Sequence, residues 1–300
     1  MKYVYSLCVL FIFSFQVKTQ DIEYKPQWGK LAEKDIITKQ CHFDTLAPGV
    51  VMYEFCLLKA SLYKLPVINV YRRIKVFDKQ KFDSYANVSI HYYSRNNTEN
   101  VNNLEAQTVN INEDGDTLIY EVDKEHIYTT NEDEYTDKIS FSFPKVQDGS
   151  ILEYRYEITT KNRINPYTWY FQNNLPTLQS SCCGLVGEGI NLNLIVIGEK
   201  TTNEIDKADE KLNTITLHNL EAIPDEPYCP SPRDYIEQIQ FQLGGYFLVS
   251  KGLFDEGDTT HWNFITNWDE FNNEVYKTES YEYFLSKKGF ARRILKDVVG

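Results

Sequence analysis

The feature that most constrains the fold of this chain is a series of short segments rich in valine, isoleucine, tyrosine and phenylalanine. The series begins at Val50, and polar or glycine-containing stretches separate its members. β-branched and aromatic residues favour strands, and several segments alternate between apolar and polar side chains. The first members read VVMYEFCLL, VINVYRRIKVFD, YANVSIHYYS, AQTVNI, TLIYEV, KISFSFP and ILEYRYEITT. The pattern predicts a mostly β chain that forms an antiparallel β-sandwich-like domain.

The same texture continues in NLNLIVIGE, NTITLHNL and IEQIQFQLG, so we expect the β domain to occupy residues 49–250. The charged segment KTTNEIDKADEK between two of these strands is expected to be a solvated hairpin loop. Residues 21–48 are a polar lead-in. Residues 251–300 are expected to be a linker and a short C-terminal helical segment, because Asn267 is a good helix N-cap and apolar residues follow it at helical spacing.

Residues 1–20 have the form of a secretory signal peptide. Lys2 precedes an apolar stretch of about a dozen residues, which is too short for a comfortable membrane span. We therefore expect the mature chain to be exported to the periplasm or cell envelope, without a stable membrane span. The net charge of −12 argues against nucleic acid and anionic membrane surfaces as partners. A protein or a cell-envelope polymer stays open as the partner.

The stretch WYFQNNLPTLQSSCCGLVGEG, residues 169–189, raises the question of a reactive thiol. A catalytic cysteine needs a base within hydrogen-bond reach, and nothing in the sequence places a histidine beside Cys182 or Cys183. On a strand these two side chains point to opposite faces. We expect Pro176 to end one segment and LQSSCC to begin the next strand, with the mature cysteines buried as small apolar residues. The mature cysteines are Cys41, Cys56, Cys182, Cys183 and Cys229.

No motif for a serine hydrolase, a phosphate-binding loop, a zinc protease or a dinucleotide site occurs in the sequence. The acidic stretches NEDGD and TTNEDEYTD are alternatives for calcium binding, but neither has the spacing of an EF-hand loop, and solvated turns are the preferred interpretation. The sequence thus predicts no catalytic, cofactor-binding or metal-binding residue and no cofactor.

The order of several segments resembles domain-of-unknown-function family 3857 (DUF3857), the exported N-terminal domain of bacterial transglutaminase-like proteins. In that family a strand with a glycine and an E-Y-x-Y motif leads to an aromatic segment W-x-F-Q-x-x-x-P. The matching residues here are Gly149, Glu153, Tyr154, Tyr156, Trp169, Phe171, Gln172 and Pro176. The resemblance implies a β-sandwich-like domain followed by helices that lead into a papain-like core with a Cys, His and Asp triad. The chain stops at Gly300, about where that core would begin, so the resemblance assigns no catalytic residue here.

Three functional hypotheses follow. The first is a non-catalytic exported domain with a binding or scaffold role. The second is an enzyme with an unrecognised site near Cys182 and Cys183. The third is a remnant that folds poorly alone. The alternative to the first hypothesis is the front fragment of a transglutaminase-like or protease-like enzyme whose Cys, His and Asp core lies beyond residue 300. Under the first, Trp169 and Phe171 pack into the sandwich, and each buries area worth roughly 2–3 kcal/mol.

Overall fold

The computed structural model describes residues 25–187, 189–205, 213–223, 234–250 and 258–263. Its strands are β1 (Gly49–Ala60), β2 (Val67–Val76), β3 (Asn87–Tyr93), β4 (Glu99–Ile111), β5 (Thr117–Glu121), β6 (Tyr128–Asn131), β7 (Thr136–Ser142), β8 (Ile151–Thr160), β9 (Tyr167–Tyr170), β10 (Thr177–Val186), β11 (Ile190–Ile197), β12 (Asn213–Leu220), β13 (Gln238–Ser250) and β14 (Asp258–Asn263). The helices are α1 (Glu33–Ile37), α2 (Lys79–Phe82) and α3 (Glu199–Ile205), with 3₁₀ turns at Asp83–Ala86, Arg95–Asn97 and Lys124–His126.

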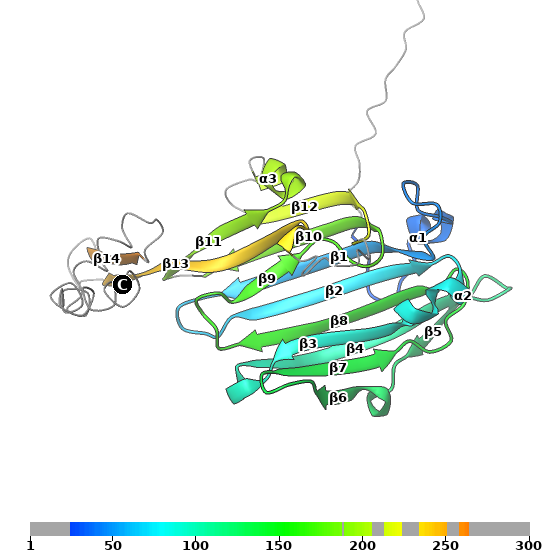
Figure 1. The fold of residues 1–300 in the computed structure, drawn as a ribbon, viewed down its shortest axis with the longest axis horizontal. Coiled ribbons are helices and arrows are strands. Elements are labelled where there is room, and N and C mark those ends of the chain that lie inside the picture. The colour runs from blue at the N-terminus through cyan, green and yellow to red at the C-terminus, as the bar shows by residue number, and fades with distance from the viewer. Residues whose placement is uncertain (1–24, 188, 206–212, 224–233, 251–257, 264–300) are drawn as a thin grey trace, which may run out of the picture.

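The largest element is a seven-stranded sheet in the order β12-β10-β1-β2-β8-β4-β5 (Figure 1). Its neighbouring strands run antiparallel, except that β1 and β10 are parallel. The parallel pair places Cys56 directly opposite Cys182. More than a hundred residues separate those strands, so their pairing is a long-range feature that no local pattern predicts.

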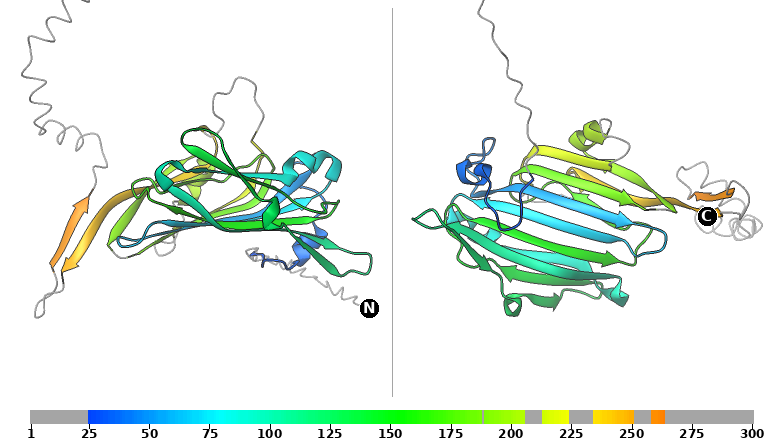
Figure 2. Two further views of the ribbon diagram at one scale, coloured as in Figure 1. Left: turned by 90° about the horizontal axis from the view of Figure 1, so that it is seen from below. Right: turned by 180° about the vertical axis from the view of Figure 1, so that it is seen from behind.

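A second layer covers one face of the large sheet in two separate pieces (Figures 1 and 2). One piece is a three-stranded sheet in the order β3-β7-β6. The other is a four-stranded sheet in which β13 pairs with β11, β14 and β9. Each piece has its own core against the large sheet, because the inward side chains of its strands pack on different residues of that sheet.

The cores follow from the alternation of side chains along the strands. Beneath the three-stranded sheet, Ile90 and Phe141 pack with Ile74 and Leu152 of the large sheet. Beneath the four-stranded sheet, the core combines side chains of β9, β13, β1, β2, β8, β10 and β12. Its members are Cys56, Leu58, Ile68, Val70, Ile158, Trp169, Phe171, Cys182, Ile215, Leu217, Leu220, Ile239 and Phe241. The other face of the large sheet is covered in part by the lead-in, where Cys41 packs on Val50, Met52 and Leu178.

The mostly β fold with antiparallel sheets is confirmed, as is the burial of Trp169 and Phe171, which are 4% and 0% exposed. Three local expectations differ from the structure. The acidic stretch that begins at Thr129 contributes part of β6, the predicted hairpin loop after Gly198 begins with α3, and strand β14 was not among the expected elements. The signal peptide and the helices expected after Asn267 lie outside the described residues.

Candidate functional site

A row of polar side chains crosses the covered face of the large sheet. In the strand register Ser180 of β10 lies opposite Glu54 of β1, Glu54 opposite Arg72 of β2, and Arg72 opposite Tyr154 of β8. Cross-strand neighbours on one face lie within reach of each other, so the register alone brings these groups together.

Glu54 is the fixed centre of this row, and it is 0% exposed. Its carboxylate accepts hydrogen bonds from Ser180 Oγ at 2.7 Å, from Asn173 Nδ2 at 3.1 Å and from Arg72 Nε at 2.8 Å. Burial raises the pKa of Glu54 above its ordinary value, and the charge of Arg72 with these hydrogen bonds opposes that rise. Glu54 is therefore an anchor for Arg72 and is shielded from solvent.

Arg72 itself is not fully enclosed, because 23% of its side chain is exposed. Nε and Nη2 both contact the same oxygen of Glu54, and the guanidinium carbon lies 5.6 Å from the centroid of the Tyr154 ring. The rings of Tyr154 and Tyr156 are stacked, with an interplanar angle of 3°. Burial raises the pKa of Tyr156 above the ordinary tyrosine value. Its phenol therefore stays neutral and can serve as a hydrogen-bonding group.

These side chains form the floor of a cavity of about 630 Å³, which we call the central trough. The floor is contributed by β2 and β8 through Arg72, Ile74, Tyr154, Tyr156 and Ile158. One side of the trough is β3, through residues 87–91, and the other side is β9 and the segment after it, through residues 167–170 and 172–175. The trough thus lies where the second layer is interrupted, and β2 and β8 are visible between β3 and β9 in Figure 1.

The opposite face of β2 carries a second arginine in a different setting. Arg73 is 0% exposed and bonds to Asp35 at 2.6 Å, to Glu153, and to the backbone oxygens of Gln27 and Lys30 at 2.9 and 2.8 Å. Glu153 accepts further hydrogen bonds from Tyr71, Gln107 and the backbone N–H of Gly29. This network, which we call the lead-in cluster, fastens residues 27–35 to the large sheet.

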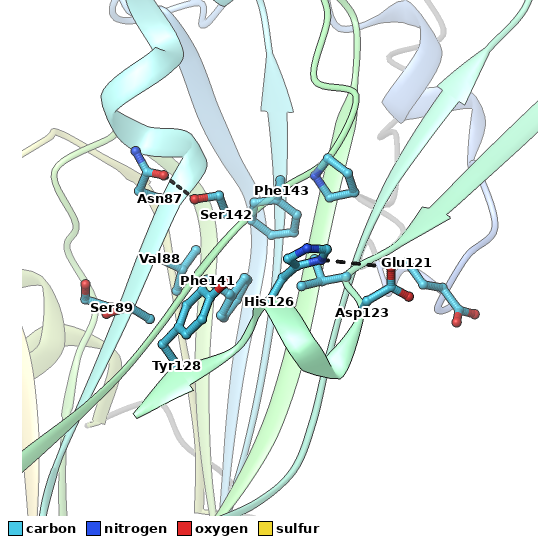
Figure 3. A pocket seen from close by; sticks show the side chains of 13 residues that line it. Asn87, Val88, Ser89, Glu121, Asp123, His126, Tyr128, Phe141, Ser142 and Phe143 are labelled. Atoms are coloured by element: carbon cyan, nitrogen blue, oxygen red, sulfur yellow. Dashed lines mark hydrogen bonds and ion pairs between the residues drawn. The ribbon is translucent and has the colours of Figure 1, made fainter. Parts of the chain in front are cut away.

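A second hollow of about 570 Å³ lies between β3, β7 and the connection from β5 to β6 (Figure 3). His126 lies at this hollow and its Nδ1 is 3.9 Å from Asp123, but both side chains are mostly exposed. Ser142 Oγ donates to Asn87 Oδ1 and not to the histidine. The hollow therefore contains a histidine and a serine that are not arranged as a base and a nucleophile.

The residues predicted as a structural motif divide between these places. Tyr154 and Tyr156 line the trough, whereas Glu153 belongs to the lead-in cluster. Trp169 donates from its indole to Ser180 Oγ, and Phe171 is in the core. The other three support the chain. Gly149, with φ +87°, forms the turn before β8. Gln172 bonds to the backbone of Glu221 and Glu237, and the carbonyl of Pro176 accepts from Val51.

The cysteines of the described residues are buried thiols. Cys41, Cys56, Cys182 and Cys183 are free and each is at most 5% exposed. The sequence predicts that Cys182 and Cys183 face opposite sides of a strand and are buried. They are successive residues of β10, and both are buried. Burial, with Cys56 as a neighbour, raises the pKa of Cys182, which suppresses the reactive thiolate. Cys229 lies outside the described residues.

The acidic residues that lie between strands form turns in the described part of the chain. The Asp133 carboxylate accepts from the backbone N–H groups of Tyr135 and Thr136, and Asn112 caps the N–H of Asp116 across the other turn. No group of three metal-ligating side chains gathers among the described residues. No helix in this part of the chain is long and apolar enough to cross a membrane.

The sequence interpretation did not identify Glu54, Arg72 or Arg73 as site residues. The signal was present in the segment VYRRIKV, since consecutive residues of a strand face opposite sides and one of two adjacent arginines must point into the covered face. A buried charge on that face requires a partner of opposite charge. This requirement predicts an acidic residue, such as a glutamate, on a neighbouring strand.

The fold and the trough define a layered antiparallel β domain with a cleft between the two parts of its second layer. A family model described as a domain of unknown function, DUF3857, matches residues 66–224, which is a little more than half of the chain. The chain therefore belongs to the DUF3857 family. No curated protein matches it.

Solved structures share parts of the fold at low identity. A protein of Parabacteroides distasonis described as a candidate protease is 13% identical, with a TM-score of 0.50 over 66% of this chain and 41% of that one. Leukotriene A4 hydrolase of Saccharomyces cerevisiae is 11% identical, with a TM-score of 0.32 over 77% and 35%, and the M1 zinc metallopeptidase of Deinococcus radiodurans is 8% identical, with a TM-score of 0.27 over 73% and 48%. The chain spans less than half the length of each. The first match shows a shared fold alone.

Proposed function

We propose that this chain is an exported, non-catalytic DUF3857 domain that acts by binding, and that the central trough is its binding site. The observation that carries the proposal is the setting of Arg72. A buried glutamate fixes its position, and yet part of its guanidinium side chain faces a large cleft beside stacked tyrosines. Polar groups that converge beside aromatic side chains in a cleft can fix the orientation of a ligand.

The same geometry favours binding over catalysis. The buried thiol of Cys182 has a raised pKa, and burial also raises the pKa of Glu54, whose oxygens are already occupied by three side chains. A general base must reach the proton it removes, and a nucleophile must be accessible and activated. The groups of the trough meet the requirements of recognition, namely a fixed cation, phenol hydroxyls and aromatic faces.

The alternative is that the chain is the front fragment of an enzyme whose transglutaminase-like or protease-like core lies beyond residue 300. Membership of the DUF3857 family and the likeness to the Parabacteroides distasonis protein are consistent with that context. In that case the trough would bind the substrate or the neighbouring core, and its role in this chain would still be recognition.

Ligand-observed NMR with a defined panel tests the proposal. The panel contains capped peptides, N-acetylglucosamine oligosaccharides and simple dicarboxylates. We expect saturation transfer to at least one class, which is lost in the double variant Glu54→Gln/Arg72→Gln. The double change replaces both charged groups with neutral amides, so it leaves no buried charge alone.

The matched control is His126→Ala in the second hollow, which should leave binding unchanged. Mass spectrometry of the panel after long incubation should find every compound intact. Turnover of any compound, rapid stoichiometric labelling of Cys182 or Cys183 by a thiol reagent, or binding that survives the double variant would contradict the proposal.

A further inference from the structure

The two sides of the central trough are strand edges, which is unusual for a cleft between sheets. Consecutive residues of both strands line it, from Asn87 to His91 and from Tyr167 to Tyr170. Successive side chains of a strand point to opposite faces of its sheet, so a cavity on one face contacts only every second residue. A cavity that contacts every residue in turn therefore lies along the edge of the strand. Within the described residues, β3 pairs only with β7, and β9 pairs only with β13.

The register shows which backbone groups point into the trough from β9. The N–H of Phe171 donates to the carbonyl of Glu237, and strand pairing continues from there with Trp169 opposite Ile239. Hydrogen-bonded pairs alternate in an antiparallel ladder, so Phe171 and Trp169 direct their backbone groups toward β13. The N–H and C=O of Thr168 therefore point away from β13, into the trough.

The opposite side is built in the same way. The N–H of Phe143 donates to the carbonyl of Ala86, which places Val88 and Ile90 in the pairing with β7 and leaves Ser89 directed away from it. Two strand edges thus face the same cleft above the central strands of the large sheet (Figure 1). Exposed edges attract further strands, and natural proteins usually cover or block them.

Resting on the proposed function, we propose that the ligand of the trough is an extended polypeptide segment of a partner protein, which adds a strand to the β9 edge and places a carboxylate on Arg72. The β9 side is the one adjacent to Arg72, because Asn173, which follows β9, shares Glu54 with that arginine. Polypeptides present N–H and C=O groups at the spacing of a strand edge, which oligosaccharides do not.

The charge of the floor specifies the side chain that the peptide brings. Arg72 has one carboxylate partner, and Nη1 lies outside the contacts to Glu54. An acidic side chain that points down from the added strand would meet this guanidinium, whereas a lysine would be repelled by it. A neighbouring side chain of the same parity would rest on Tyr156, which is half-buried and lines the trough.

The probe is a capped ten-residue peptide library with glutamate fixed at a central position and serine, threonine, valine and tyrosine elsewhere. Matched libraries carry glutamine or lysine at the centre. Two further libraries keep the glutamate and are N-methylated at either the odd or the even positions, which removes backbone donors of one parity and leaves the side chains in place.

We expect fluorescence anisotropy to detect binding of the glutamate library, with roughly 10-fold or more weakening for glutamine, since a hydrogen bond to a charged group is lost. At least one of the N-methylated libraries should weaken to a similar extent. Hydrogen exchange should show new protection of the Thr168 amide in the complex.

The protein variant Thr168→Pro removes an edge donor of β9 that points into the trough, and Thr129→Pro is its control. Thr129 lies on β6, at the outer edge of the three-stranded sheet, where pairing of Glu132 with Thr136 and the register of β7 leave its N–H directed outward. Proline is tolerated at such edge positions. Thr168→Pro should weaken binding about 10-fold or more, and Thr129→Pro should leave it unchanged.

Binding that tolerates both N-methylated libraries, or that leaves the Thr168 amide unprotected, would overturn strand addition but leave a binding function for the trough. Absence of binding by the glutamate library would also overturn this inference, even if another class of the panel binds in an Arg72-dependent manner. The proposed function fails separately, when no class of the panel binds through the trough. The N-methylated peptides test the wild-type protein, so misfolding of Thr168→Pro would not leave the inference without a test.

Discussion

Arg72 and Arg73 are adjacent on β2, point to opposite faces of one sheet, and each has a buried glutamate on a neighbouring strand. Arg73 is fully enclosed, with two carboxylates and two backbone oxygens around it. Arg72 has one carboxylate and keeps nearly a quarter of its side chain exposed to a cleft. The same residue type, one position apart, is thus a structural fastener on one face and an accessible cation on the other.

The difference between the two arginines shows that the number of internal acceptors around a guanidinium can indicate whether it is structural or available to a ligand. A buried guanidinium has five N–H donors, and in the lead-in cluster the surrounding oxygens occupy it from several sides. The guanidinium of Arg72 is fixed by Glu54 through two of its nitrogens. A cation held in place beside a cleft is prepared for an external anion, whereas one enclosed by internal acceptors is not.

Removing the cation of the lead-in cluster should have the largest effect on stability. Arg73→Met leaves Asp35 and Glu153 buried without their cation, and breaking such a pair costs about 3–5 kcal/mol. Urea denaturation followed by tryptophan fluorescence measures the loss. The residues around Gly29 should also become susceptible to limited proteolysis, because Arg73 fastens them to the sheet. A variant as stable as the wild type, with a protected lead-in, would show that the cluster is not structural.

The matching change in the trough should cost less. Arg72→Met leaves Glu54 with Ser180 and Asn173 as hydrogen-bond donors, so we expect a loss of about 1–3 kcal/mol at neutral pH. Glu54 already has a raised pKa because it is buried, and loss of the arginine removes a group that lowers it. In the variant, protonated Glu54 favours the folded state.

The stability of Arg72→Met relative to wild type should therefore be highest below the ordinary glutamate pKa and decline as the pH rises through the raised value. Urea titrations of both proteins at a series of pH values check this. A deficit that is constant with pH would indicate that the arginine acts through packing alone. A deficit as large as that of Arg73→Met would remove the distinction between the two faces.

The fold was largely predictable, because its information is local. Alternating aromatic and β-branched residues mark strands such as β7 and β8 directly in the sequence. Short or charged elements were not predictable, because they lack an apolar pattern. All four residues of β6 are exposed, and α3 begins in a stretch dominated by charge. The parallel pairing of β1 with β10 depends on contacts across the whole domain, and no pattern within either strand encodes it.

The site was less predictable for a related reason. Tyr154 and Glu153 are adjacent in a motif that the sequence marks as one unit, yet the strand divides them between the trough and the lead-in cluster. The sequence predicts that Tyr154 and Glu153 point to opposite faces of the strand, but it does not identify the residues that they contact. Arg73 and Glu153 are 80 positions apart, and only the order of the strands brings them together.

The smallest effect concerns Lys75, which lies on the same face of β2 as Arg73. Its Nζ donates to the carbonyl of Gly149 at 2.7 Å, and burial, together with Lys39, lowers its pKa to about 8, with Asp35 acting in the opposite direction. The unfolded chain then binds more protons than the folded one between pH 8 and the ordinary lysine value, so this residue makes stability rise with pH across that window.

Lys75→Met should abolish that rise, with a change of less than about 1 kcal/mol, since partial access of water to the amine screens its charge. Urea midpoints of the variant and the wild type at pH 7.5, 9 and 10.5 provide the comparison. Arg72→Met serves as the control, because its pH dependence belongs to the acidic range. If the stability of Lys75→Met still rose with pH, Lys75 would not be the cause of the rise. The buried face would then hold the charged amine at no cost relative to water. The enclosure that distinguishes the Arg73 face from the trough would then be confined to the arginine itself.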